Sequence, residues 1–192
     1  MKVLFGVLLC AALTCAAFGT TQEALSSKPK KEFKHKFQIT SKYDKGKDQT
    51  IVTLKPMPIT TSMAKEVTNL KQIPQMDLEV YFTYPGDHVA KPVGDATIAL
   101  HSISPNIVYR QPQDLIAVLN AQSYLPLGTT TYKSISKTFM FEEILSLSVP
   151  LDAMQKMSNA KDMELVLGRQ RELKLTEPQM EALRDITSRM SP

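Results

Sequence analysis

Cysteine is scarce in this 192-residue chain, and the positions of its two cysteines matter more than their number. Cys10 and Cys15 both lie in the N-terminal segment. If that segment is cleaved near Gly19, the mature chain has no cysteine at all. It then has no disulfide, no thiolate nucleophile, no thiolate metal site and no iron–sulfur ligation. Such a chain has to be held together by its hydrophobic core.

Histidine and glycine are also scarce, and tryptophan is absent. The chain has three histidines and seven glycines, and no His-x-x-x-His or His-Glu-x-x-His pattern of the kind that binds zinc. A Gly-x-Ser-x-Gly turn, a phosphate-binding glycine loop and a dinucleotide fingerprint are missing too. We therefore assign no catalytic, cofactor-binding or metal-binding residue from the sequence, and we expect no cofactor. The histidines are His35, His88 and His101.

Paired carboxylates are the remaining signal for acid–base chemistry, which needs two such groups close together. Three pairs are adjacent or two residues apart: Asp77 with Glu79, Glu142 with Glu143, and Asp162 with Glu164. Such pairs occur by chance on any strand that has one side in water. We interpret all three as parts of solvated strand faces.

Scattered aromatic residues indicate an alternative, a platform for a ligand or a carbohydrate. Tyr81 and Tyr84 fall on opposite faces of one expected strand, and the other tyrosines are spread along the chain. Because aromatic residues are not dense, we expect most of them to be core residues or to lie at the rim of the core.

The first residues have the pattern of a secretory signal peptide. Lys2 is followed by an apolar run over residues 3–18 and then by small residues. The run is shorter than the roughly 20 residues that a membrane-spanning helix needs. We expect removal of residues 1–19, export to the periplasm or the medium, and no transmembrane segment in the mature chain. Cleavage a few residues away and lipid anchoring at Cys15 remain open alternatives.

The excess of positive charge comes from one part of the chain. Residues 28–48 hold eight lysines and three acidic residues, a balance of +5 (eight minus three). We expect a basic flexible arm over residues 20–36. Phe33, Phe37 and Tyr43 are interleaved with the lysines, so this arm could contact an anionic surface, or it could be a solvated linker. We expect no nucleic-acid partner.

The middle of the chain reads mainly as strands. Residues 37–43 and 49–54 form an expected hairpin whose turn has Gly46 at positive φ, and Pro56 and Pro58 are expected to end its second strand. Residues 60–75 read as a long loop insertion with at most one helical turn. Further expected strands or extended segments cover residues 76–84, 96–103, 107–110, 115–119, 123–133 and 138–149. The last of these is expected to be the longest and to lie centrally in its sheet.

The C-terminal part predicts a short helix, a hairpin and a closing helix. Residues 152–158 read as two helical turns, and residues 163–167 and 173–175 alternate as two strands. Thr176 and Gln179 form a capping box before a helix of some 13 residues. Met180, Leu183, Ile186 and Met190 make one apolar stripe on that helix. Glu181 and Arg184 are spaced for an ion pair on its other side.

These elements together predict a mainly β fold. We expect an antiparallel β-sandwich or open barrel with a short helix and a C-terminal amphipathic helix packed on it. Residues 37–192 are expected to form a single β-rich domain.

Three stretches carry a resemblance. They are YDKGKDQTIVTLKPMP (residues 43–58), LEVYFTYPG (residues 78–86), and SVPLDAMQKMSNAKDMELVLG with LTEPQMEALRDI (residues 148–186). They resemble uncharacterised exported bacterial proteins, often small, for which lipid anchoring is an open alternative. The resemblance implies export, a bacterial source and one domain, and it transfers no catalytic residue.

The sequence therefore leads to two functional hypotheses. The first is an exported, non-enzymatic β-rich module, envelope-associated or secreted, with a binding or structural role. The alternative is a hydrolase that assembles Ser, His or carboxylate groups from distant parts of the chain. A concave pocket with His88 or His101 within reach of both a serine and a carboxylate would favour the alternative.

Overall fold

The computed structural model describes residues 32–61, 76–168 and 171–192. Residues Glu32–Pro192 form one compact unit. The expected signal peptide and most of the expected basic arm lie outside the described residues, as does the expected loop insertion except for Thr60 and Thr61, which belong to a strand.

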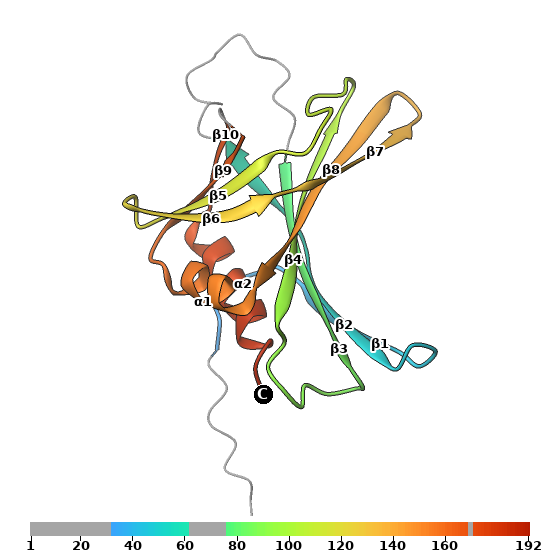
Figure 1. The fold of residues 1–192 in the computed structure, drawn as a ribbon, viewed down its shortest axis with the longest axis vertical. Helices are drawn as coiled ribbons and strands as arrows, with labels where there is room; N and C mark the ends of the chain where they lie inside the picture. Colours follow the sequence, from blue (N-terminus) through green and yellow to red (C-terminus); the bar gives the residue numbers. More distant parts are fainter. Residues whose placement is uncertain (1–31, 62–75, 169–170) are drawn as a thin grey trace, which may run out of the picture. The chain divides into compact units, whose positions relative to one another are not determined.

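Ten antiparallel strands make two sheets, one of six strands and one of four (Figure 1). The order in the first is β1 (Ile39–Asp44), β2 (Gln49–Thr61), β3 (Met76–Pro85), β4 (Asp95–Ser104), β8 (Met140–Pro150) and β7 (Thr131–Lys137). The order in the second is β10 (Arg171–Lys174), β9 (Met163–Leu167), β5 (Asp114–Leu119) and β6 (Ser123–Thr129). The predicted mainly β, sandwich-like fold is confirmed.

The two sheets are joined at two corners. At one corner the end of β2 pairs with β10, through Thr60 and Thr61. At the other, β6 runs into β7 through Thr130, which is buried. The Thr130 amide donates to the Gln113 carbonyl oxygen (2.8 Å), and the Gln113 amide donates to Thr130 Oγ1 (3.0 Å). The expected single strand over residues 123–133 is therefore two strands that belong to different sheets.

The prediction that Pro56 and Pro58 end the second strand is wrong. The strand β2 continues to Thr61, with a register shift against β3 between Leu54 and Met57. Pro56 lies in that irregularity, where a missing amide proton breaks no regular ladder bond. Pro58 lies opposite Asp77 of β3, beyond the segment that pairs with β1 and before the two residues that pair with β10. The prolines therefore bend the strand without ending it.

Two further strand details differ from the sequence analysis. In the β1–β2 turn the residue at positive φ is Asp48 (φ 47°), not Gly46, because the turn puts the left-handed residue directly before β2. The strand expected over residues 138–149 begins at Met140, since Thr138 and Phe139 form the β7–β8 turn. That strand, β8, is second from the edge of its sheet and shorter than β2, so the predicted central, longest strand is also wrong.

The core fills the space between the inner faces of both sheets and the two helices. Along β3 the buried residues alternate with more exposed ones, as the period-two pattern predicted. The helices α1 (Leu151–Asn159) and α2 (Glu177–Ser188) lie together against this space (Figure 1). All four residues of the predicted α2 stripe are buried.

The capping box of α2 also fastens the helix to the larger sheet. Gln179 accepts hydrogen bonds from the Thr176 amide (2.6 Å) and hydroxyl (2.9 Å). Its side-chain amide donates to the carbonyl oxygen of Pro58 on β2. One glutamine therefore begins the helix and sets its place on the sheet.

Arg184 joins the two helices. It forms the predicted ion pair with Glu181 (2.5 Å) and a second with Glu177 (2.7 Å). Its guanidinium also donates to the carbonyl oxygens of Ser158 (3.0 Å) and Ala160 (2.9 Å), where α1 ends. The charges that are dense in this part of the sequence therefore build the fold. Within the described ranges, no helix is long and apolar enough to cross a membrane.

Glu143 is a carboxylate with no exposed surface. It points to the inner side of β8, whereas its neighbour Glu142 points outward. Its oxygens accept hydrogen bonds from the amides of Val108 and Tyr109 (2.8 Å each) and from the Tyr132 hydroxyl (3.1 Å). A buried carboxylate is tolerated because these donors replace its hydration. Glu143 thereby fixes the segment after β4.

Removing this carboxylate should destabilise the fold strongly. In Glu143→Ala, two backbone amides and one phenol lose their acceptor, so the free energy of unfolding should fall by about 3 kcal/mol. Glu143→Gln keeps one acceptor oxygen and should lose less. Urea unfolding measures both. Glu164→Ala, which removes a partly exposed partner of Lys174, should change stability by about 1 kcal/mol or less, and an equal loss in the two alanine variants would contradict the role given to Glu143.

Candidate functional site

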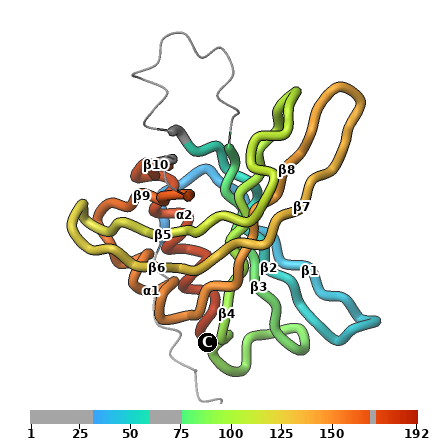
Figure 2. The backbone as a smooth tube through the Cα atoms, turned by 45° about the horizontal axis from the view of Figure 1, so that its top comes forward, coloured from blue at the N-terminus to red at the C-terminus, as the bar shows by residue number. Residues whose placement is uncertain are grey.

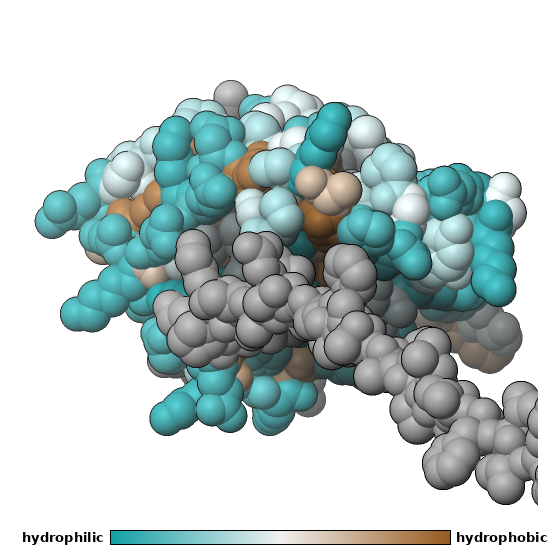
Figure 3. Space-filling model, turned by 90° about the horizontal axis from the view of Figure 1, so that it is seen from below, coloured by the Kyte–Doolittle hydropathy of each residue, from teal (hydrophilic) through white to brown (hydrophobic). Residues whose placement is uncertain are grey.

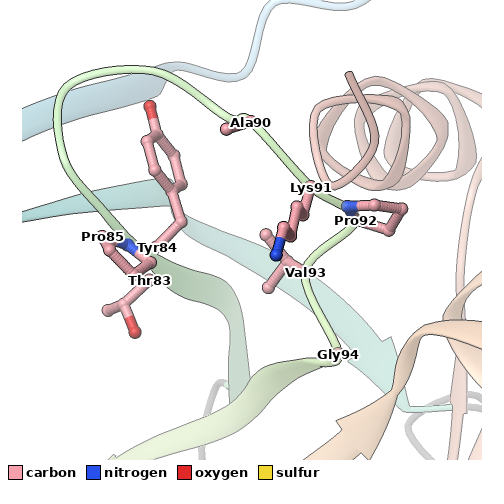
Figure 4. A pocket seen from close by; sticks show the side chains of 8 residues that line it. All are labelled: Thr83, Tyr84, Pro85, Ala90, Lys91, Pro92, Val93 and Gly94. Carbon is pink, nitrogen blue, oxygen red and sulfur yellow. The ribbon is translucent and has the colours of Figure 1, made fainter.

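A pocket of about 430 Å³ lies between the end of β3 and the segment that leads into β4 (Figure 4). Its walls are mostly apolar, and the Lys91 ammonium is the one cation among the lining residues. Figure 4 shows Tyr84 on one wall and Lys91 and Val93 on the facing wall. The lining residues are Thr83, Tyr84, Pro85, Ala90, Lys91, Pro92, Val93 and Gly94.

Hydrogen bonds fix both ends of this pocket segment. At the first end, the Gly86 amide donates to the Asp48 carbonyl oxygen (2.9 Å), and the buried Thr50 hydroxyl donates to the Gly86 carbonyl oxygen (2.6 Å). Gly86 has a φ of +76°, which a residue with a side chain rarely adopts. The segment is therefore tied to β2 where it leaves β3.

The second end is tied to both helices. The Val93 amide donates to the Met190 carbonyl oxygen just after α2 (2.7 Å). The Leu151 amide at the start of α1 donates to the Gly94 carbonyl oxygen (2.7 Å). The side chain of Val93 is buried in the core, and that of Val89 packs against it. The backbone of the pocket segment is therefore held in place by the rest of the fold.

This pocket lies at the end of the molecule from which Figure 3 is viewed. The surface there is mainly hydrophilic, and hydrophobic residues show through it in a few places. Pockets of a few hundred Å³ with apolar walls and few polar groups are typical of small-molecule sites.

Apart from the pocket, a cluster of polar side chains lies on the outer face of the larger sheet. His101 of β4 contacts Glu79 of β3 (Nε2 to Oε2, 3.1 Å) and Glu142 of β8 (Nδ1 to Oε1, 3.4 Å). Lys137 of β7 pairs with the other oxygen of Glu142 (2.5 Å). Four side chains thus connect four neighbouring strands.

The cluster favours the charged forms of His101 and Glu142. The hydrogen bond that His101 donates to Glu79 raises the pKa of His101 above its ordinary value, against the opposing effect of partial burial and with help from Glu142. The hydrogen bond from Lys137 lowers the pKa of Glu142, again against partial burial. A protonated imidazole that donates from both nitrogens fits between two carboxylates. The arrangement links the outer faces of β3, β4, β8 and β7.

The other two histidines also contact carboxylates. His88 lies in an exposed turn beside Asp87 (2.7 Å). His35, from the expected basic arm, is nearly buried and contacts Asp185 of α2 (3.2 Å), which Arg189 also binds. The serine next to His101, Ser102, is completely buried on the opposite face of β4. These contacts do not assemble the serine, histidine and carboxylate group that the hydrolase hypothesis needs.

The three carboxylate pairs are not brought together as acid–base pairs. Glu79 is hydrogen-bonded to His101. Asp77, two residues earlier on β3, lies directly opposite His101 in the register. Glu142 and Glu143 point to opposite faces of β8. Asp162 precedes β9, so its expected place on a strand face with Glu164 is wrong. Among the residues that the structure describes, no group of three or more His, Asp or Glu could hold a metal ion.

No sequence pattern indicates the pocket. Tyr84 was expected to be a core or rim residue, and nothing in the sequence shows that it faces Lys91 and Val93. Comparison with protein-family models, with curated proteins and with solved structures gave no match.

The raised pKa of His101 predicts that part of the stability depends on pH. A group whose pKa is raised on folding stabilises the fold below its unfolded pKa, about 6.5 for histidine, and this contribution is lost as the pH rises through the folded value. The free-energy difference between wild type and His101→Gln should therefore be largest near pH 6 and shrink by pH 8, by on the order of 1 kcal/mol. Urea unfolding at several pH values measures it.

The origin of the raised pKa can be tested in the same protein. Glu79→Gln should lower the pKa of His101, followed by NMR titration, more than Glu142→Gln does. A stability difference that stays constant from pH 5.5 to 8, or a His101 pKa at its ordinary value, would show that the cluster has no such coupling.

Proposed function

We propose that this chain is an exported, non-enzymatic binding module and that its ligand site is the pocket under residues 86–94. The observation that carries the proposal is a cavity of about 430 Å³ whose lining segment is hydrogen-bonded to β2, α1 and the end of α2. A site that exists before binding needs little ordering when a ligand enters.

The lining of the pocket indicates the chemistry of the ligand. Proline, alanine and valine side chains and the Tyr84 ring offer apolar contact, and Lys91 offers one positive charge. A small molecule with an apolar body and one anionic group matches both features. A fatty acid of medium length and an aromatic carboxylate or sulfonate belong to this class.

Export is supported by the N-terminal sequence. Lys2, the apolar run over residues 3–18 and the small residues around Gly19 follow the order of a signal peptide. A mature chain without cysteine would fold without any oxidation step, with its described core drawn from both sheets and both helices. An envelope-associated or secreted location and a bacterial source belong to the same proposal.

The pocket can be tested with 1-anilinonaphthalene-8-sulfonate, which has an apolar body and one anionic group. Titration should give one saturable site, and amide shifts of ¹⁵N-labelled protein should change mainly in residues 83–94. Gly94 lines the pocket, and a Cβ placed there meets no atom within 4 Å. A leucine side chain at this position should therefore occupy ligand space without a clash, and Gly94→Leu should weaken binding more than tenfold. Lys91→Gln should weaken binding about two- to fivefold, as expected for one exposed ion pair.

The matched control is Lys156→Gln, which removes an exposed lysine from α1 and should leave binding unchanged. Thermal unfolding should show that Gly94→Leu still folds. Unchanged binding in a folded Gly94→Leu variant, or shifts centred elsewhere, would place the bound probe outside this pocket and contradict the proposal.

Export can be tested by expressing the full chain in a bacterial cell and fractionating that cell. Mass spectrometry of the exported form should show an N-terminus near Thr20 and no lipid. A protein that starts at Met1 in the cytosol would contradict export, and a lipid on Cys15 would replace cleavage after Gly19 by anchoring.

A further inference from the structure

Exposed apolar residues gather at the end of the larger sheet away from the pocket. The residues come from two segments, the end of β4 with the loop after it and the β7–β8 turn. Register places these segments together, because Ser104 lies opposite Phe141 and Lys137 lies opposite Met140. Both segments protrude at the same end of the molecule (Figure 2). We name this set the apolar tip: Ile103 (45% exposed), Ile107 (38%), Val108 (36%), Phe139 (92%) and Met140 (38%).

Phe139 is the centre of the apolar tip and has an unusual backbone. Its φ is 108°, a region that is nearly confined to glycine. Its amide donates to the carbonyl oxygen of Lys137 (2.8 Å), which closes a very tight turn. At 92% exposure the ring stabilises almost nothing within the fold. A glycine would make this turn without strain, so the turn itself gives no reason for a phenylalanine at this position.

The neighbouring loop is held rigidly in its exposed position. Buried Glu143 binds the amides of Val108 and Tyr109, and the Ser104 hydroxyl donates to the Asn106 carbonyl oxygen. These bonds hold the backbone on both sides of Ile107 and Val108. The apolar tip is a fixed surface built by the fold.

Cations lie close to the apolar tip. Arg110 and Lys137 lie in or beside the two segments, and Lys133 lies four residues before Lys137 on β7. The acidic side chains on the same outer face are Glu142, which pairs with Lys137, and Glu79 and Asp77 further away on β3. His101, whose raised pKa favours the cation, also faces Glu142. Such a surface is complementary to anionic headgroups.

The shape of the tip favours a lipid surface over a second copy of the chain. A stable dimer buries about 800 Å² on each partner across a complementary face. The apolar tip is a narrow projection with one highly exposed ring, so it offers no such face. A bilayer needs no fixed complementary shape, and it accepts an apolar side chain below headgroups that attract lysine and arginine.

We propose that the apolar tip docks the protein on an anionic phospholipid surface, with Phe139 inserted among the acyl chains and Lys137, Lys133 and Arg110 at the headgroups. This contact is independent of the pocket and of its ligand. It uses residues other than those of the expected basic arm.

The test uses residues 32–192, the compact unit that contains the whole described core, so that neither the expected signal peptide nor the lysines before residue 32 contribute. Co-sedimentation with vesicles of phosphatidylcholine and phosphatidylglycerol should show binding that weakens as salt rises, with little binding to phosphatidylcholine alone. Phe139→Gly should reduce the partition coefficient about tenfold or more, while the stability to urea stays equal or rises because the strain is relieved.

Tyr124→Ser is the matched control, since Tyr124 is an exposed aromatic residue (71%) on β6, away from the tip. It should change binding less than twofold. Lys133→Gln should weaken binding to the anionic vesicles only. The proposal is overturned if the wild-type unit does not bind anionic vesicles or if Phe139→Gly and Tyr124→Ser lose binding equally. It is also overturned if sedimentation velocity shows that Phe139→Gly only abolishes self-association.

Discussion

The fold depends on two corners where the chain passes from one sheet into the other, one within β2 and one between β6 and β7. A sandwich needs its sheets to close around a core, and here the chain makes the corners itself, without a disulfide among the described residues. Both corners follow a register shift, between Leu54 and Met57 in β2 and between Leu115 and Ile116 on the strand opposite β6. Gly128, with φ at 123°, lies beside the second shift, and Thr130 follows it with hydrogen bonds to Gln113. Strands that change sheets commonly bend in this way. The helices then fill the space that the corners enclose.

The features that could be predicted from the sequence were periodic patterns and one local motif. The alternation in β3, the apolar stripe of α2 and the capping box at Thr176 are local patterns with one physical interpretation each, and the structure confirms them. The corners carry no such pattern, because a strand that changes sheets keeps its period-two alternation. Pro56 and Pro58 were misread for the same reason: whether a proline ends a strand depends on which neighbour would have needed its amide proton. That neighbour is known only from the register.

The buried carboxylate and the candidate pocket escaped prediction because they depend on which backbone groups meet. Glu143 looked like half of a solvated pair, and only the fold brings the amides of Val108 and Tyr109 to it. The pocket has no motif either, since its position is set by hydrogen bonds from Thr50, Val93 and Leu151 that no local sequence pattern indicates. In contrast, the absence of zinc and glycine-loop motifs in the sequence required no knowledge of the fold.

Strand β4 relates the two proposed surfaces to each other. Its first residue, Asp95, follows Gly94 of the pocket, and its last residues, Ile103 and Ser104, lead into the apolar tip. Ten residues at about 3.3 Å each separate the two surfaces by about 30 Å along the strand. A protein held on a lipid surface by Phe139 would therefore present its pocket to the aqueous side, open to a soluble ligand. The His101 cluster lies between them on the outer face of the same strand, where it joins β3, β8 and β7 and keeps the two ends in a fixed relation.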